Sequence, residues 1–394
     1  YQSISKRFKW LGWLGIAAAA LIFSFYSALG GYCLRYVVVN FGNLIGAEFG
    51  TNGVGGADVF QGLLSQPDVS IAFALAFMLI TMLVVMSGVG GGIERVCSVG
   101  MPALFFILII CIIRSCTLPG AADGLKYMFV PGWAVANGII DEAPGFWKVL
   151  TAAGGQMFFS LSLGAGVMIT YGSYLDKKQD LGKSAMIIVG MDTVVALMAG
   201  LCVIPGRFAL DPNGALGGPE LLFITMQNVF DKMGPAGPVF GILFYLLVFF
   251  AAISSSISML EVIVAHFCDK AREKGKGDRR KLYSAIAVVI CAALCALVCA
   301  DGMGSNHISP AELLGLAGAK LPGWSTSWLG LFDSVAEGLL MPLGALLMCL
   351  MISWELKPDT LRQEILLNGE NRPWVYDFFR LCVKYITPLC MLMI

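Results

Sequence analysis

The sequence predicts an all-α protein that crosses a membrane many times, and three observations support this fold class. The chain has 394 residues, of which 58% are hydrophobic and 13% are charged, and its mean hydropathy is +0.79. Soluble domains average roughly 45–50% apolar and 25% charged residues. The apolar residues also gather into runs long enough to cross a bilayer, and lysine and arginine cluster in alternate connecting loops.

The expected spans are apolar runs of about 20 residues. The first residue is Tyr1 rather than a methionine, and the last run reaches Ile394 without a polar stop, so we expect both ends of the chain to be cut. Nine runs qualify, at roughly 11–39, 69–87, 97–118, 147–175, 184–205, 236–267, 282–300, 328–354 and 375–394.

Basic residues predict the orientation of these spans. They cluster before the first span (6–9), between the fourth and fifth (177–183) and between the sixth and seventh (270–281). The loop 40–68 between the first two spans contains no lysine or arginine. Because short cytoplasmic loops are enriched in basic residues, we expect the chain to start in the cytoplasm and, after nine crossings, to end outside.

Composition argues against several other kinds of function. The 26 basic and 26 acidic residues balance, so nucleic acid is not an expected partner. The twelve cysteines lie mostly inside apolar runs, without CxxC spacing, and we interpret them as small core residues. Only His266 and His307 are present, too few for a histidine-based metal centre. The glycine-rich stretch 87–96 follows no strand and lacks a GK[ST] motif, which favours a turn over a phosphate-binding loop.

The fourth span contains residues that weaken a helix at its middle. In GGQMFFSLSLGAGVMITYGSYL (154–175), Ser160, Ser162, Gly164 and Gly166 lie at the centre of the run. Non-helical backbone at membrane depth is tolerated only where it faces protein or a water-filled cavity. Half-helix ends at such a break present their dipoles to bound charge. We therefore predict a broken helix that forms a binding site.

Three further polar features lie inside the expected spans. Asp192 and Glu261 are ionisable groups near mid-span, and Ser254–Ser256 form a hydroxyl cluster. One alternative is that each carboxyl simply bonds a neighbouring helix, and serine runs often serve as contacts between helices. Hard cations such as sodium prefer oxygen ligands. A broken helix, a buried carboxylate and hydroxyls at similar depth together predict an ion-coupled transporter.

Five segments resemble a known family. These are 154–175, DTVVALMAG (192–200), FFAAISSSISMLEVIVAHFCD (249–269), SFYSALGGYCLRY (24–36) and the stretch from 101 to 133. They resemble the bacterial neurotransmitter:sodium symporters, the LeuT-type sodium-dependent amino-acid transporters. The resemblance implies a LeuT-type inverted-repeat fold in the inner cell membrane. It also implies that 1–394 is a single transmembrane transporter domain holding family helices three to eleven, with the first two helices missing.

The resemblance also implies an amino-acid site. Tyr26 matches the tyrosine that holds the substrate carboxylate, and Phe159 matches the aromatic lid, so both also belong to the outer gate. Asp269 matches the acid of the cytoplasmic gate. The substrate-binding positions implied are Ile22, Tyr26, Phe159, Ser160, Ser162, Ala165, Ser255 and Met259.

Two sodium sites follow from the same resemblance. Ser160 and Asp192 match side-chain ligands of the first ion, and the substrate carboxylate completes its shell. For the second ion, the carbonyl of Ala251 and the hydroxyls of Ser254 and Ser255 match the ligands. Sodium, an amino acid and the lipid bilayer are therefore the expected partners, and the oligomeric state is left open.

Three departures from the family pattern carry further expectations. Asp192 stands where many members have asparagine, and Ala196 stands where chloride-dependent members have a serine, so we expect chloride independence. Ala165 replaces a larger side chain, which favours a bulky hydrophobic or aromatic substrate. The position expected to hold an outer-gate aspartate is Ala336, with Glu337 next to it.

Other functions fit the same sequence less well. A non-transporting amino-acid-binding or vestigial homologue is one alternative, and a proton-coupled amino-acid transporter in which Asp192 or Glu261 titrates is another. An intramembrane protease is disfavoured because the spans lack GxSxG, HExxH and paired catalytic aspartates. The chain is therefore not expected to be an enzyme.

Overall fold

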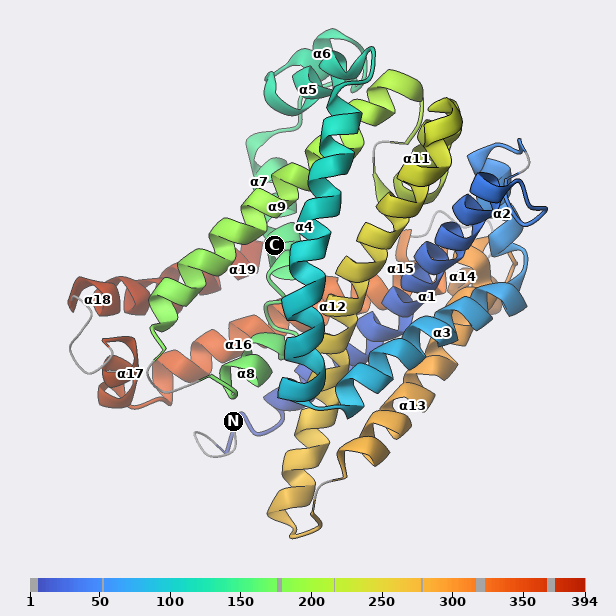
Figure 1. Ribbon diagram of the computed structural model, residues 1–394. Coiled ribbons are helices and arrows are strands. Elements are labelled where there is room, and N and C mark those ends of the chain that lie inside the picture. Colours follow the sequence, from blue (N-terminus) through green and yellow to red (C-terminus); the bar gives the residue numbers. More distant parts are fainter. Residues whose placement is uncertain are drawn as a thin grey trace.

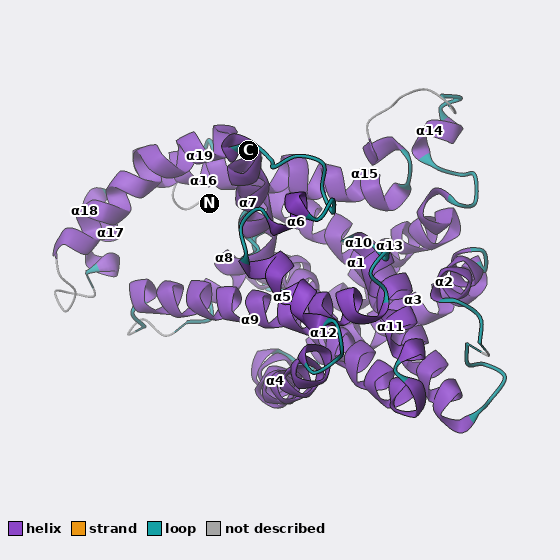
Figure 2. Ribbon diagram, turned by 90° about the horizontal axis from the view of Figure 1, so that it is seen from above, coloured by secondary structure: helices purple, strands orange, loops and turns teal. Residues whose placement is uncertain are grey.

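The computed structural model describes residues 6–51, 53–175, 179–215, 217–277, 279–316, 323–366 and 373–393. Within these ranges the chain folds into helices joined by short connections, and no β-strand occurs (Figures 1 and 2). The expected all-α class is therefore confirmed.

Seven helical segments of the described chain are long and apolar enough to cross a membrane. Two of them contain a π-helical turn, Val89–Ile93 before α4 and Ala336–Leu340 between α15 and α16. The helices of these segments are α1 (Leu11–Ile45), α3 (Pro67–Met86), α4 (Glu94–Cys116), α9 (Leu181–Leu210), α12 (Gly237–Glu273), α13 (Arg280–Asp301), α15 (Trp328–Val335) and α16 (Met341–Trp354).

The other two expected spans are helical but interrupted. The run 147–175 is divided into α7 (Phe146–Ser160) and α8 (Val167–Gly172). The run 375–394 corresponds to α18 (Pro373–Leu381), a π-helical turn and α19 (Thr387–Met393), and it carries charges such as Arg380 and Lys384. The shorter helices are α2 (Gly56–Leu64), α5 (Ala121–Phe129), α6 (Trp133–Ala136), α10 (Gly218–Glu220), α11 (Met226–Lys232), α14 (Pro310–Leu313) and α17 (Pro358–Ile365).

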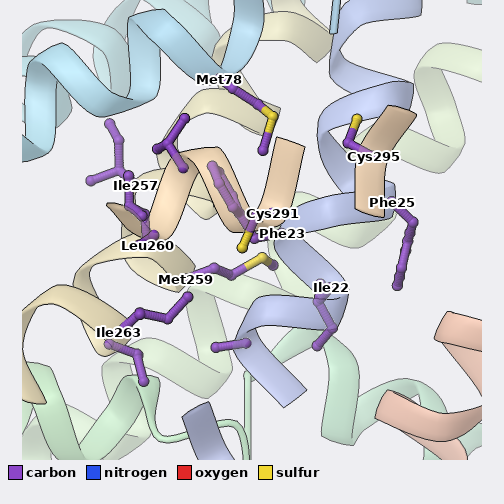
Figure 3. Packing of buried hydrophobic residues seen from close by; sticks show 14 of the residues in the cluster. Ile22, Phe23, Phe25, Met78, Ile257, Met259, Leu260, Ile263, Cys291 and Cys295 are labelled. Carbon is purple, nitrogen blue, oxygen red and sulfur yellow. The ribbon is translucent and has the colours of Figure 1, made fainter. Parts of the chain in front are cut away.

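The centre of the molecule is α1, which packs along α12 and is flanked by α3 and α13 (Figure 1). Small residues let these backbones approach closely. A Cβ at Gly31 of α1 would lie 2.5 Å from the backbone nitrogen of Ala74 in α3. Such contacts matter in lipid, where hydrophobic burial does not drive helices together. Their side chains form the main apolar core, in which Phe23 and Leu260 are fully buried (Figure 3).

Several of the short helices lie at one end of the molecule. Figure 1 shows α2, α5, α6 and α11 at the top, opposite the N-terminus and the turn between α12 and α13. The basic clusters at 6–9 and 270–281 therefore lie at the same end, as the predicted orientation requires. We refer to the end that carries α5 and α11 as the outer end.

Candidate functional site

The predicted break in the fourth span is present between α7 and α8. Ser162, Gly164 and Gly166 have positive φ values of 51°, 80° and 79°. Positive φ is uncommon for a residue with a side chain, so Ser162 is a strained position of the kind found at functional sites. The backbone turns back on α7 here, since the nitrogen of Leu163 donates to the carbonyl of Phe158 at 2.9 Å.

Close backbone contacts hold this break in place. A Cβ at Gly164 would overlap the carbonyl oxygen of Met341, and a Cβ at Gly344 of α16 would lie 3.1 Å from the carbonyl oxygen of Gly164. On the other side, a Cβ at Gly15 of α1 would lie 3.3 Å from Gly166. The break is therefore packed against protein, which is the condition for irregular backbone at membrane depth.

The first pair of predicted sodium ligands is brought together. The Ser160 hydroxyl, on the last residue of α7, donates to Oδ1 of Asp192 in the middle of α9 at 2.6 Å. This short distance is typical of a hydrogen bond to a carboxylate. The alternative that Asp192 bonds a neighbouring segment is thus also realised, and one contact places the two predicted ligands beside the break. Asp192 is only half-buried and Ser160 is exposed, so the carboxylate is less buried than expected.

The serine run of α12 divides between two roles. Ser256 is fully buried and its hydroxyl lies 2.8 Å from that of Thr81 in α3, so it connects two helices. The hydroxyl of Ser254 instead donates to the carbonyl of Ala251 at 2.8 Å. In the second predicted sodium site, the Ser254 hydroxyl and the Ala251 carbonyl are therefore in contact. For Ser256, the alternative of a contact between helices applies.

The predicted substrate residues gather around the core between α1 and α12. Ile22, Met259 and Ala165 are 2%, 7% and 2% exposed and belong to one apolar cluster, against which Tyr26 and Phe159 pack. Figure 3 shows the Met259 side chain extending toward Ile22. The hydroxyl of Tyr26 faces the hydroxyl of Ser255 on α12. Ser162 is half-buried at the break.

The predicted cytoplasmic-gate acid lies at the opposite end from α5 and α11. Asp269 is exposed and forms an ion pair of 3.9 Å with Arg272, one helical turn further along α12. It also borders a hollow of about 190 Å³ between α1, α8 and α12, whose walls include Gly15, Gly166 and His266. Asp269 and Gly166 at the break therefore border the same hollow.

A buried ionic network near that end was only partly anticipated. Glu261 is fully buried, accepts a 2.6 Å hydrogen bond from the Tyr174 hydroxyl and forms an ion pair with Arg280 at the start of α13. Nε of Arg280 also donates to the carbonyl of Val85 at the end of α3, at 2.7 Å. The alternative that Glu261 bonds a neighbouring helix is therefore realised. The partner, Arg280, belongs to the basic cluster 270–281 and is the first residue of α13.

At the outer side, the expected gate position points into the protein. Ala336 is fully buried, whereas Glu337 is half-buried and its carboxyl lies beside that of Asp333, four residues earlier. The π-helical turn Ala336–Leu340 begins at this point, and such a turn adds a residue to the helical repeat. Asp333, which received no role from the sequence, is therefore the direct neighbour of Glu337.

Comparison with known proteins gives consistent matches. A model described as the sodium:neurotransmitter symporter family matches residues 57–394. The chain is 36% identical over 404 residues to the uncharacterized sodium-dependent transporter YhdH of Bacillus subtilis, covering 100% of this chain and 81% of that protein. It is 29% identical over 228 residues to sodium-dependent nutrient amino acid transporter 1 of Drosophila ananassae, covering 54% and 33%.

A solved structure shares the fold. The crystal structure of MhsT in complex with L-phenylalanine aligns with a TM-score of 0.79 and 32% identity, covering 99% of this chain and 81% of that chain.

Proposed function

Because the chain belongs to the sodium:neurotransmitter symporter family and has the LeuT-type fold, we propose that it imports an amino acid together with sodium, without chloride. The observation that carries this proposal is the hydrogen bond between Ser160 and Asp192 across the break after α7. It supplies oxygen ligands and one negative charge where a broken helix permits a bound cation.

We assign two sodium sites to the described residues. The first consists of Ser160 and Asp192 together with the carboxylate of the substrate. The second consists of the Ala251 carbonyl and the hydroxyls of Ser254 and Ser255, supported by the 2.8 Å contact between Ser254 and Ala251. Because Asp192 already neutralises a sodium ion, no chloride is needed at the Ala196 position.

The proposed substrate is a bulky hydrophobic or aromatic amino acid. The Tyr26 hydroxyl, beside Ser255, holds its carboxylate, and Ala165 leaves room for a large side chain near Ile22 and Met259. One similar protein is named a nutrient amino acid transporter, and the structure of another contains L-phenylalanine, which supports this class.

We propose transport by alternating access in the inner cell membrane. Sodium and substrate bind at the break and favour the state that encloses them, so differential binding shifts the population of states. Tyr26 and Phe159 then close the outer side. The region around Asp269 opens toward the cytoplasm, and the Glu261–Arg280 ion pair holds the same end together when it is closed.

The test is uptake of radiolabelled L-phenylalanine into vesicles containing the purified protein. We expect uptake to require a sodium gradient, to stop when choline replaces sodium at constant pH, and to persist when gluconate replaces chloride. Excess tryptophan or leucine should compete more strongly than glycine or alanine. Uptake that continues in choline but follows a pH gradient would indicate proton coupling, and binding without uptake would indicate a non-transporting protein.

A further inference from the structure

The helices α4 and α9 approach each other closely near the outer end. A Cβ at Gly206 of α9 would lie 3.0 Å from the hydroxyl of Ser115 in α4. The thiol of Cys116 in α4 donates to the carbonyl of Leu201 in α9 at 3.7 Å. Small side chains at such positions let two helix backbones come close together.

One helical turn further in, two free thiols meet across this interface. Cys111 lies four residues before Ser115, and Cys202 lies four residues before Gly206. Residues four apart lie on the same helix face, so the two cysteines lie on the faces of α4 and α9 that contact each other. Their side chains are neighbours that line one cavity, and the residues are 6% and 3% exposed. Both cysteines are free.

A small cavity adjoins both thiols. It lies between α4, α9, α11 and α12, and Cys111, Cys202, Ser115 and Gly206 are among its lining residues. About 10 Å³ of it is open to a molecule the size of water. The hydroxyl of Ser115 is buried there and has no hydrogen-bond partner among the described residues. The cavity therefore places about one water's worth of space and this hydroxyl beside the two cysteines.

We propose that Cys111 and Cys202 are a modification site that forms a reversible disulfide between α4 and α9 on exposure to a peroxide. One thiol attacks the peroxide oxygen, forming a sulfenic acid and releasing water. The second thiol then attacks that sulfur and releases another water. In total, two thiols are oxidised to one disulfide and one hydrogen peroxide is reduced to two waters, with no further reactant.

The chain contains a natural comparison pair on α13. Cys295 and Cys299 are also neighbours and are 2% and 0% exposed. They lie four residues apart on one helix, where Cβ atoms are about 5–6 Å apart. A disulfide requires about 3.5–4.5 Å between Cβ atoms. Neighbouring buried thiols are thus common to both pairs, but only the Cys295–Cys299 pair is held apart by the spacing of residues within one helix.

The test uses the purified protein in lipid vesicles, treated with hydrogen peroxide and then unfolded with a maleimide reagent that labels free thiols. We expect ten of the twelve cysteines to be labelled, a mass about 2 Da lower before labelling, and a cross-linked peptide that joins Cys111 to Cys202. Dithiothreitol should restore twelve labelled thiols.

Three variants provide the controls. Cys111→Ser and Cys202→Ser should each abolish the cross-link, whereas Cys295→Ser should leave it unchanged. Twelve labelled thiols after peroxide treatment of the wild-type protein would overturn the proposal. So would a cross-link that joins any other two cysteines, or a sulfinic acid at Cys111 without a bond to Cys202. Since the wild-type measurement is decisive, the proposal can be tested even where a variant fails to fold.

Discussion

At the scale of single residues, the site depends on a carboxylate that lies in an apolar span. An ionised group inside a membrane is costly unless it is paired, hydrogen-bonded or bound to a cation. The hydrogen bond from Ser160 satisfies one oxygen of Asp192, and its negative charge remains to attract a cation. Ser254 and Ser256 each donate to the carbonyl three residues earlier, at 2.8 and 2.9 Å, and they differ because the Ser256 hydroxyl also contacts that of Thr81 on α3.

Replacing Asp192 by Asn should weaken sodium binding. The amide keeps the shape but removes the charge, so we expect the sodium concentration for half-maximal uptake to rise on the order of tenfold, about 1.4 kcal/mol. Sodium titration of uptake measures this change. Thr193→Val is the matched control, because the Thr193 hydroxyl bonds only its own helix, at Val189. An unchanged sodium curve for D192N would remove Asp192 from the sodium site.

The serine run allows a second comparison. Ser254→Ala should raise the sodium requirement of uptake with little effect on thermal stability. Ser256→Ala should do the reverse, because it breaks the buried hydrogen bond to Thr81 and costs about 1–3 kcal/mol of folding free energy. Sodium titration and thermal unfolding of both variants separate the two roles. Equal sodium dependence in the two variants contradicts the assignment of Ser254 as a ligand.

At the scale of elements, glycine residues determine where α7 ends and how closely the following backbone packs against its neighbours. The break between α7 and α8 requires left-handed backbone at Gly164 and Gly166, and Gly164 also lies against the carbonyl of Met341. A left-handed conformation is readily adopted only by glycine. Local interactions also determine where α14 begins, because Ser309 and Glu312 make a reciprocal capping box there.

Gly164→Ala should damage the break. The new methyl group would need positive φ and would overlap the Met341 carbonyl, so we expect a loss of at least about 1 kcal/mol of stability and little or no uptake. Gly155→Ala is the control, since Gly155 lies in α7 with open space around its Cα. That variant should be neutral or slightly stabilising. Uptake retained by G164A would show that the break tolerates a side chain.

The capping box predicts a pH dependence. Hydrogen bonds from His307 and the Ser309 backbone lower the pKa of Glu312 below its ordinary value of 4.5. A lowered pKa means that ionised Glu312 stabilises the fold above the ordinary pKa, and that this contribution is lost as pH falls through the folded-state pKa.

We therefore expect the melting temperature of Glu312→Gln to be lower than that of the wild-type protein at pH 7, and the difference to shrink as the pH falls below the ordinary value of 4.5. Thermal unfolding at several pH values measures it. Glu364→Gln in α17 removes an exposed carboxyl and is the control. A difference between E312Q and wild type that grows as the pH falls would contradict the sign.

At the scale of the whole molecule, the buried ionic network connects distant segments of the chain. Glu261 in α12, Arg280 in α13, Tyr174 after α8 and the carbonyl of Val85 in α3 meet at the end opposite α5 and α11. A buried ion pair adds little stability compared with apolar packing, but removing one partner leaves an uncompensated charge. The network therefore fixes how these helices meet.

Arg280→Ala should leave Glu261 buried and unpaired, with a loss of about 3–5 kcal/mol in folding free energy. Denaturation in detergent measures this loss, and combining R280A with Glu261→Gln should recover part of it. Arg279→Ala alters the exposed neighbour and should have almost no effect. If R280A and R279A are equally stable, the ion pair does not contribute to the closed end.

Much of the fold and site could be predicted from the sequence because the signals are local. Apolar run length identified the spans, and Ser162, Gly164 and Gly166 at mid-span identified the break, which the structure confirms. The side chains of Ser160 and Asp192 were expected in one site, and the structure brings them together. Their roles in binding sodium stay predictions, as do those of Tyr26, Phe159 and Asp269.

By itself, the sequence determined that this protein is a helical membrane protein with a broken fourth span, because hydropathy and glycine placement act along a single segment. Only the tertiary structure decided which serine faces Thr81, which cation neutralises Glu261, and that Cys111 meets Cys202. These outcomes depend on the rotation and approach of helices far apart in the chain. Those quantities are set by packing between side chains of several helices, which no single segment contains.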